Sequence, residues 1–300
     1  MVTFVLIHIA PGDPIYTLAG DGGDEAYYTQ MRALYGLDRP LPEQLLRYIL
    51  EVLRGDLGYS FTYQQPVLQV ILDRIPATLL LMGAALTFST TVGILLGVVA
   101  SVRPRTPTDY SISVITLAFF AMPVFWLGQL MIILFAVVFK VFPVQGMVSV
   151  REEYTGWRHV LDVAYHLVLP ALTLGLVQLA QTARLTRTSL REVLQEDFVR
   201  TARSKGLRER HVIMRHALRN ALLPVVTVLG GQIGVLLTGA ALTETIFAWP
   251  GLGRLLLDAT LARDYPVLMG IFILVAITVV VANLITDLVY TLLDPRVRFN

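Results

Sequence analysis

The chain of 300 residues contains no cysteine, which excludes a disulfide, a thiolate metal site and a catalytic thiol. It is also poor in lysine: only Lys140 and Lys205 are present, and neither follows a glycine. A GxxxxGK[ST] phosphate loop is therefore absent, so the chain does not bind ATP in that way. The sequence also lacks the HExxH pattern of zinc hydrolases and the GxSxG elbow of serine hydrolases. We expect no enzymatic activity, no cofactor and no metal site.

Charged residues are scarce as well, at 15% of the chain, whereas 55% of the residues are hydrophobic and the mean hydropathy is +0.65. Such a composition is too apolar for a soluble domain of this length. A hydrocarbon core needs about 20 apolar residues per helix. Five stretches meet that length: residues 77–101, 110–139, 166–183, 222–243 and 266–286. The sequence therefore predicts an all-α integral membrane protein.

The apolar run at residues 1–10 is too short to span a membrane, and we interpret it as part of a first transmembrane helix that is truncated. Residues 11–76 are predicted to be an extracytoplasmic segment. Residues 77–291 form the transmembrane core, which includes a cytoplasmic loop at residues 184–222. Residues 292–300 form a cytoplasmic tail.

Within the extracytoplasmic segment, leucines and isoleucines recur at helical spacing over residues 41–53, which predicts an amphipathic helix. Packing of its apolar face on protein is favoured over a position at the membrane interface. Farther along, Trp249, Pro250, Gly251 and Gly253 interrupt the apolar pattern and predict a tight reversal. An ordinary interfacial turn and a re-entrant piece near a pore mouth explain this reversal equally well.

Residues 184–220 form a basic segment that holds ten of the 24 Lys and Arg residues. Apolar residues at helical spacing predict one helix before Lys205 and Gly206 and a second helix after them. On the first helix, one face is predicted to carry the apolar residues Leu190, Val193, Leu194, Phe198 and Ala202. A helix pair of this size is not needed to join two membrane spans. We therefore expect another subunit to dock on it.

Charge placement predicts the orientation in the membrane. If the basic segment faces the cytoplasm, that side carries 14 basic and 7 acidic residues in all, and the rest of the chain carries 10 basic and 15 acidic residues. This asymmetry follows the positive-inside rule. A role of these charges in orientation alone is an alternative to docking that the sequence leaves open.

The predicted spans contain few polar side chains, and the candidates for a translocation path are the amides Gln129, Gln178 and Gln232. Hydrogen bonds between helices explain these amides equally well. A carrier driven by an ion gradient commonly holds ionisable residues at membrane depth. The five complete spans have no carboxylate or arginine in the middle, which weakens that hypothesis without excluding it.

Two stretches of the basic segment resemble the cytoplasmic loop of permeases in binding-protein-dependent ABC importers: residues 196–207 (EDFVRTARSKGL) and 216–224 (HALRNALLP). The closest resemblance is to the B-type permeases of the dipeptide, oligopeptide and nickel group. Further matching motifs lie at residues 8–14 (HIAPGDP), 37–40 (LDRP), 55–58 (GDLG), 243–254 (TETIFAWPGLGR), 263–266 (RDYP) and 293–296 (LDPR). The general importer motif has Glu-Ala-Ala, three residues and Gly, whereas here Arg200, Thr201 and Ala202 stand first, as in the peptide-group variant.

The resemblance implies a six-helix ABC importer transmembrane domain with cytoplasmic coupling helices, in the bacterial or archaeal cytoplasmic membrane. It implies four kinds of partner: a second permease subunit, two ATP-binding cassette ATPase subunits, an extracytoplasmic solute-binding protein and membrane lipid, with no nucleic acid. The residues implied to couple to the ATPase are Arg200, Thr201, Ala202, Arg203, Lys205, Gly206 and Leu207. Those implied to lie near the external gate are Glu244, Trp249, Pro250, Gly251 and Gly253.

Our leading hypothesis is that the chain is the permease subunit of an importer for dipeptides, oligopeptides or a similar small solute, working by alternating access. ATP hydrolysis then belongs to the partner subunits. The alternatives are an ion-coupled secondary transporter and, more weakly, a membrane scaffold or channel whose basic loop binds anionic lipid. The cargo stays open among peptides, glutathione-like solutes and nickel chelates, because the binding protein does most of the choosing.

Overall fold

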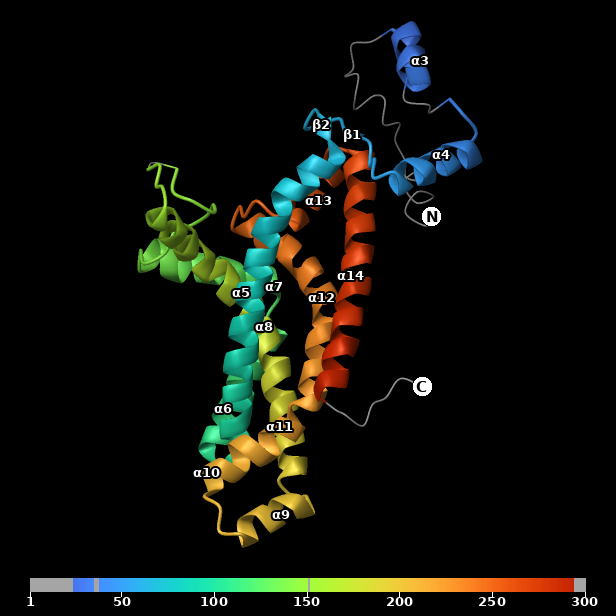
Figure 1. Ribbon diagram of the computed structural model, residues 1–300. Coiled ribbons are helices and arrows are strands. Elements are labelled where there is room, and N and C mark those ends of the chain that lie inside the picture. The colour runs from blue at the N-terminus through green and yellow to red at the C-terminus, as the bar shows by residue number, and fades with distance from the viewer. Residues whose placement is uncertain (1–23, 35–37, 151, 294–300) are drawn as a thin grey trace. The chain divides into compact units, whose positions relative to one another are not determined.

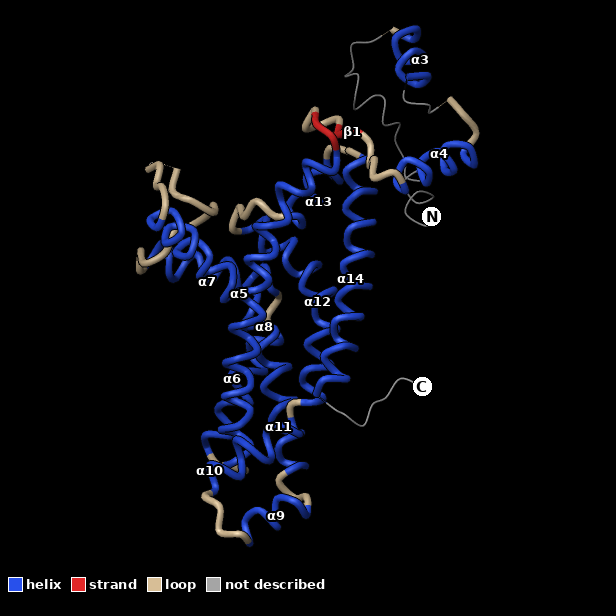
Figure 2. Tube along the Cα trace, in the orientation of Figure 1, coloured by secondary structure: helices blue, strands red, loops and turns tan. Residues whose placement is uncertain are grey.

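The computed structural model describes residues 24–34, 38–150 and 152–293, and side chains are described within these ranges except at 31–34, 229–239 and 286–293. The described chain is almost entirely helical (Figure 2). Its elements, in chain order, are α3 (Glu25–Leu34), α4 (Leu41–Leu53), β1 (Tyr59–Ser60), β2 (Gln65–Pro66), α5 (Val67–Val102), α6 (Pro107–Ala121), α7 (Val124–Met131), η1 (Ile132–Val138), α8 (Trp157–Val193), α9 (Asp197–Ser204), α10 (Glu209–His211), η2 (Val212–Ala217), α11 (Leu218–Ala221), α12 (Leu223–Ile246), α13 (Leu252–Leu261) and α14 (Tyr265–Leu293). The elements η1 and η2 are stretches of π-helix.

Three of these helices, α5, α8 and α14, are long and apolar enough to cross a membrane. The pair formed by α6 and the α7–η1 helix adds a fourth span if it is counted as one. Only described residues enter this result, so the predicted span at residues 222–243 lies partly outside it. The partial helix predicted at residues 1–10 lies wholly outside the described residues.

Two prolines in predicted spans behave differently. Pro123 breaks its span, since α6 ends at Ala121 and the following helix departs at an angle of 105°. The prediction of a single span over residues 110–139 therefore becomes a broken span or a re-entrant loop. Pro170 stays inside the 37-residue helix α8. At the break, Met122 has an extended backbone, which is the conformation that the residue before a proline favours.

The chain divides into two compact units. The first comprises residues 1–78 and 250–277, and the second comprises residues 79–249 and 278–300. The predicted boundary between residues 76 and 77 falls inside α5, which begins at Val67 and contains Pro76. At about 1.5 Å per residue, this 36-residue helix is longer than a hydrocarbon core is thick. Its first turns therefore belong with the segment that the sequence assigns outside the membrane.

The first unit packs the start of α5 against α13 and the start of α14. Its core consists of Val67, Val70, Ile71, Leu252, Leu255, Ala259, Val267, Leu268 and Ile271. The β1–β2 hairpin is tied to this core by Asp264, whose Oδ2 accepts hydrogen bonds from Ser60 Oγ at 2.6 Å and Thr62 N at 3.0 Å. The amphipathic helix predicted at residues 41–53 is present as α4, but none of its residues is buried. The expectation that its apolar face packs on protein is wrong for the described chain.

In the second unit, α8 packs against α6, α7, α11 and α12 (Figure 1). The C-terminal part of α5 also approaches α8 very closely. A Cβ atom on Gly97 would lie 2.6 Å from Thr186 Cβ and 2.7 Å from the Ala183 carbonyl oxygen. Gly93, one turn earlier, meets Thr182 in the same way. The spacing Gly-x-x-x-Gly thus brings the two helices together, as small residues do in membrane proteins.

Candidate docking surface

The basic segment, residues 184–220, is built from the end of α8 and from α9, α10, η2 and α11, which gather at one end of the second unit (Figure 1). Its apolar side chains form one core: Leu190, Val199, Ala202, Val212, Ile213, Ala217, Leu218 and Ala221. Two helices on either side of Lys205 and Gly206 were predicted, and the structure confirms this break. The structure also adds a break that the sequence did not reveal, since α8 ends at Val193 and α9 begins at Asp197.

This extra break changes which residues of α9 face inward. Phe198 was predicted to share one face with Leu190 and Ala202, which are buried, but 42% of Phe198 is exposed, and the neighbouring Val199 is fully buried instead. The three residues between α8 and α9 rotate the short helix relative to the predicted continuous one. Ala202 stays on the same side as Leu190 and is buried, with 7% exposed. Its side chain therefore supports α9 from within the chain and is not part of the outer surface.

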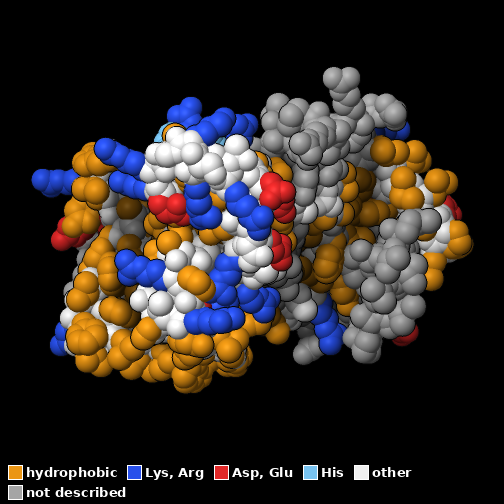
Figure 3. All heavy atoms as spheres, turned by 90° about the horizontal axis from the view of Figure 1, so that it is seen from below, with side chains coloured by type: hydrophobic (Ala, Val, Ile, Leu, Met, Phe, Trp, Pro, Cys, Tyr) orange, Lys and Arg blue, Asp and Glu red, His pale blue; other side chains and the backbone are white. Residues whose placement is uncertain are grey.

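The remaining residues predicted to couple to an ATPase lie on the outside. Arg200, Thr201, Arg203, Lys205 and Gly206 are exposed, and Leu207 is 39% exposed. Lys and Arg side chains dominate this end of the molecule, with few acidic groups among them (Figure 3). The surface therefore combines positive charge with two exposed apolar side chains, Phe198 and Leu207.

The turn after α9 depends on glycine and on an ion pair. Gly206 has φ = +74°, a conformation that side chains disfavour, and its N–H donates to the Arg203 carbonyl oxygen at 2.9 Å. The Arg203 guanidinium donates to Glu209 across the turn, from Nε at 3.1 Å and from Nη2 at 2.7 Å. These hydrogen bonds lower the pKa of Glu209 and raise that of Arg203. Arg203 thus shapes the turn as well as contributing charge.

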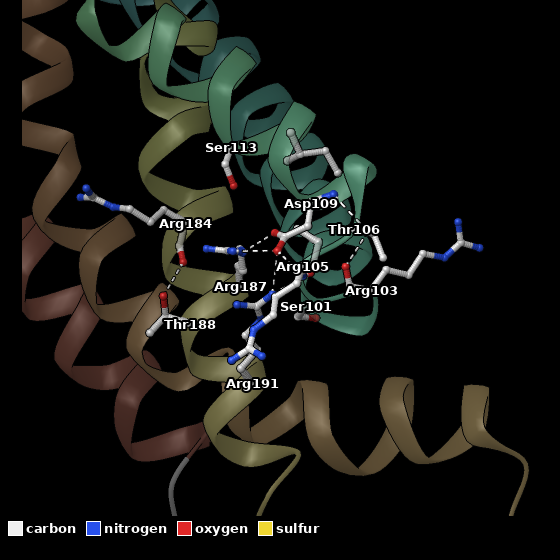
Figure 4. A network of polar contacts seen from close by, with 12 residues as sticks. Ser101, Arg103, Arg105, Thr106, Asp109, Ser113, Arg184, Arg187, Thr188 and Arg191 are labelled. Atoms are coloured by element: carbon white, nitrogen blue, oxygen red, sulfur yellow. Dashed lines mark hydrogen bonds and ion pairs between the residues drawn. The ribbon is translucent and has the colours of Figure 1, made fainter.

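A second charged cluster, centred on Asp109, was missed by the sequence analysis. Asp109 is 1% exposed and lies in the first turn of α6. Its Oδ2 accepts hydrogen bonds from Arg187 Nη2 and Arg191 Nη2, both at 2.9 Å, and Arg187 Nε lies 2.6 Å from Oδ1 as an ion pair. The backbone N–H of Arg105 donates to Oδ2 at 3.0 Å. Figure 4 shows Arg187 and Arg191 reaching toward Asp109, whereas Arg103 and Arg184 point away.

The Asp109 cluster joins three parts of the second unit. Arg187 and Arg191 are one turn apart near the end of α8, and Asp109 lies in the first turn of α6. Arg191 Nη2 also donates a hydrogen bond to the Ala100 carbonyl oxygen of α5 at 3.4 Å. Part of this arrangement was detectable in the sequence. Thr106-Pro107 before Asp109 is a helix start signal, with Thr106 as N-cap, and the two arginines are four residues apart. Nothing in the sequence indicated that these groups meet.

The residues predicted near an external gate are mostly buried. Glu244 and Trp249 are fully buried in the second unit, and Trp249 N donates to the Glu244 carbonyl oxygen at 2.8 Å. Gly251 and Gly253 are buried in the first unit, and Pro250 is half-buried. The predicted interruption is confirmed, since α12 ends at Ile246 and α13 begins at Leu252.

Two of the three predicted path residues, Gln129 and Gln178, have described side chains. Gln129 is exposed on α7 and Gln178 is half-buried on α8, and neither side-chain amide forms a hydrogen bond with a described residue. The side chain of Gln232 lies outside the described residues. These three positions remain predictions.

Comparison with known proteins decides the family. The family model of the binding-protein-dependent transport system inner membrane component matches residues 93–299, and the model of the N-terminal part of such membrane components matches residues 1–82. The chain belongs to this family. It is a multi-pass membrane permease component of an importer, which settles the choice left open between an importer permease, an ion-coupled carrier and a scaffold.

Two relatives span almost the whole chain. The dipeptide transport system permease protein DppB of Escherichia coli strain K12 is 44% identical over 316 residues, covering 99% of this chain and 93% of the relative. The di/tripeptide transport system permease protein DppB of Pseudomonas aeruginosa strain UCBPP-PA14 is 42% identical over 313 residues, with the same coverage.

Among solved structures, an inward-facing conformation of the MetNI methionine ABC transporter aligns with a TM-score of 0.61 at 18% identity. The alignment covers 76% of this chain and 97% of that one. An amino acid ABC transporter crystallised with histidines aligns with a TM-score of 0.51 at 14% identity. The predicted fold, an all-α ABC importer transmembrane domain, is confirmed.

Proposed function

We propose that the chain carries peptides, and in particular dipeptides, across the cytoplasmic membrane of a prokaryote as one permease subunit of an ATP-driven importer. Support for the cargo comes from the 44% identity to a dipeptide permease over 99% of the chain. ATP hydrolysis is assigned to two separate ATPase subunits, since this chain has no phosphate loop. A second permease subunit and an extracytoplasmic solute-binding protein complete the assembly.

The docking surface for the ATPase is assigned to α9 and the turn that follows it. The observation that carries this proposal is the construction of that region: a short helix held from beneath by Val199 and Ala202, with basic and apolar side chains on its outer side. Lys205 and Leu207 offer a charge and an apolar contact next to each other. Such a combination suits a protein partner, because apolar burial stabilises the contact and charge orients it.

In this proposal, the basic segment and the tail face the cytoplasm, in agreement with the positive-inside rule. Movement of the docked ATPase subunits is passed to α8 through the apolar core shared by α9, η2 and α11. The Asp109 cluster then carries it from α8 to α6. The helices rock as rigid bodies and expose the path alternately to the two sides of the membrane, as in hinge and shear movements of other proteins.

The residues around the interruption between α12 and α13 are assigned to the external gate. In the described state Glu244 and Trp249 are buried, as expected for a closed gate on the side from which the binding protein delivers peptide. The amides Gln129, Gln178 and Gln232 stay candidates for the translocation path. An amide at membrane depth needs a partner, and a hydrated peptide can supply one.

The test is co-purification of the chain with its ATPase subunits from membranes. We expect the wild type to retain the ATPase and Gly206→Pro to lose it, since proline fixes φ near −65° and cannot adopt the φ of +74° at this turn. The matched control is Gly206→Asn, because asparagine tolerates the left-handed conformation. It should retain the ATPase.

Equal amounts of each variant in the membrane fraction establish that the proteins insert normally. Retention of the ATPase by Gly206→Pro, or its absence from the wild type, would show that the turn is not the docking site. Peptide specificity is tested separately, by uptake of labelled dipeptides in cells that lack their own dipeptide permease.

A further inference from the structure

A cavity of about 290 Å³ lies between α6 and α8, with Ala100 of α5 also in its lining. One wall is apolar and is formed by Ile112, Leu117, Phe120, Ala180 and Ala183. The polar lining includes Ser113 and Thr116 of α6 and Arg184 and Arg187 of α8. All of these residues belong to the second unit. The cavity is therefore a largely apolar groove whose lining includes two arginines.

The charges at this groove are not balanced within the described chain. The single carboxylate nearby, Asp109, is engaged by both Arg187 and Arg191. Arg184 forms no ion pair with any described residue, it is exposed, and it points away from the Asp109 cluster (Figure 4). This end of the groove thus holds one carboxylate, which two arginines share, and a third arginine that has no ion-pair partner among the described residues. An anion is the complement that this end of the groove lacks.

The outer face of α6 beside the groove is apolar and exposed. Tyr110, Val114, Ile115, Leu117 and Phe120 are each about half exposed or more. In a membrane protein, such a face contacts hydrocarbon chains. An occupant of the groove therefore meets apolar side chains along its length and guanidinium groups at its end, which is the chemistry of an amphiphile with an anionic head.

We propose that the groove between α6 and α8 binds one anionic phospholipid. Its phosphate group pairs with Arg184, and an acyl chain lies along Ile112, Leu117 and Phe120. Basic pockets between membrane helices on the cytoplasmic side are sites at which anionic headgroups gather, and Arg184 and Arg187 of the groove are the first arginines of the basic segment. This site requires only that the chain spans a membrane, so it stands independently of the peptide cargo.

The experiment is native mass spectrometry of the chain purified with its companion subunits, stripped of lipid in detergent and incubated with phosphatidylglycerol or phosphatidylcholine. We compare the wild type with Arg184→Gln, which removes the unpaired charge. Ser113→Phe fills the groove and leaves every charge in place. The matched control is Arg208→Gln, which removes another exposed basic residue, outside the groove.

We expect the wild type to retain one phosphatidylglycerol in preference to phosphatidylcholine. Arg184→Gln should weaken that retention about fivefold, the loss expected for one basic contact with an anionic lipid. Ser113→Phe should abolish it, and Arg208→Gln should leave it unchanged. Because Arg184 has no ion-pair partner among the described residues, we expect its replacement to fold normally.

Three results would overturn the proposal. The first is equal retention of phosphatidylglycerol by the wild type and both groove variants. The second is displacement of the lipid by inorganic phosphate at the same molar excess, which would indicate a site for a free anion. The third is cross-linking of a photoreactive side chain at position 113 to a companion subunit in place of lipid, which would make the groove a protein interface.

Discussion

Two regions of the second unit both join a carboxylate to arginine, and they differ in what surrounds the charges. Around Asp109 the carboxylate is buried and the helices α5, α6 and α8 are in close contact. At the turn between α9 and α10, the Arg203–Glu209 pair is about half exposed and spans only six residues of the chain. We infer that the first region serves as a rigid joint and the second as a surface that meets another molecule. The following predictions test this difference, beginning with the largest effect.

Replacement of Asp109 by alanine should have the largest effect on stability. It leaves Arg187 and Arg191 without their shared partner, and breaking a buried pair costs about 3 kcal/mol. The measurement is the Tm of the purified protein in detergent. Asp197→Ala is the control, since its pair with Arg200 spans 3.3 Å on the open surface and should change the Tm very little. A similar decrease in Tm for both variants would contradict the distinction between a rigid joint around Asp109 and a surface at α9.

Gly97→Ala should be the next most destabilising change, by about 2 kcal/mol, because the added methyl group would overlap Thr186 and the Ala183 carbonyl. Gly83→Ala is the control on the same helix, since no atom lies within 4 Å of the added methyl group. It should stabilise α5 slightly through higher helix propensity. Thermal unfolding of both variants measures the difference. A tolerated Gly97→Ala would mean that α5 and α8 can separate without cost.

In the exposed region, Gly206→Ala should cost about 1 kcal/mol, because space around the added methyl group is open and only the positive φ opposes it. The loss should be confined to the turn. Hydrogen exchange of the amides at residues 204–208 measures it, and we expect faster exchange there with no change in α8. Faster exchange throughout α8 would show that the turn and the joint are one cooperative structure.

The smallest effect is expected at Glu209. The Arg203 guanidinium lowers the pKa of Glu209 below its usual 4.5. The ion pair therefore contributes its full stabilisation of the turn at neutral pH. This stabilisation is lost as the pH falls below 4.5 and through the lower pKa that Glu209 has in the folded protein. The contribution is about 0.5 kcal/mol for so exposed a pair. A spin label on Leu207→Cys should become more mobile at acid pH, and Glu209→Gln should make that mobility independent of pH. Unchanged mobility in the wild type would contradict this role of the pair.

The sequence alone predicted the membrane class and the helices before and after Gly206. These features follow from local patterns, namely apolar length and the conformational freedom of glycine. It did not predict the break between α8 and α9, so it placed Phe198, and not Val199, on the same face as Leu190 and Ala202. Three residues without a glycine or proline carry that break. The Asp109 cluster joins residues 78 and 82 positions apart, and no local pattern encodes such a meeting.

Docking at the residues that the family motifs name stays a prediction, and the structure shows only which of them are exposed. Arg200, Lys205 and Leu207 lie on the outer surface as expected, but Ala202 supports the helix from within. Ala202 differs from the other three residues because it lies on the side of α9 that packs on the core, whereas they lie on the opposite side or in the turn. One face of α9 is therefore available to a partner, and the other is committed to the chain itself.

The most direct test of the docking surface uses the absence of cysteine from the chain. A single Leu207→Cys variant is treated with a thiol cross-linker in membranes that contain the whole importer, and Val150→Cys, 98% exposed in the loop before α8, serves as the control. We predict that position 207 cross-links to the ATPase subunit and position 150 does not. No cross-link from position 207, or equal cross-links from both positions, would contradict the assignment of α9 and its turn as the docking surface.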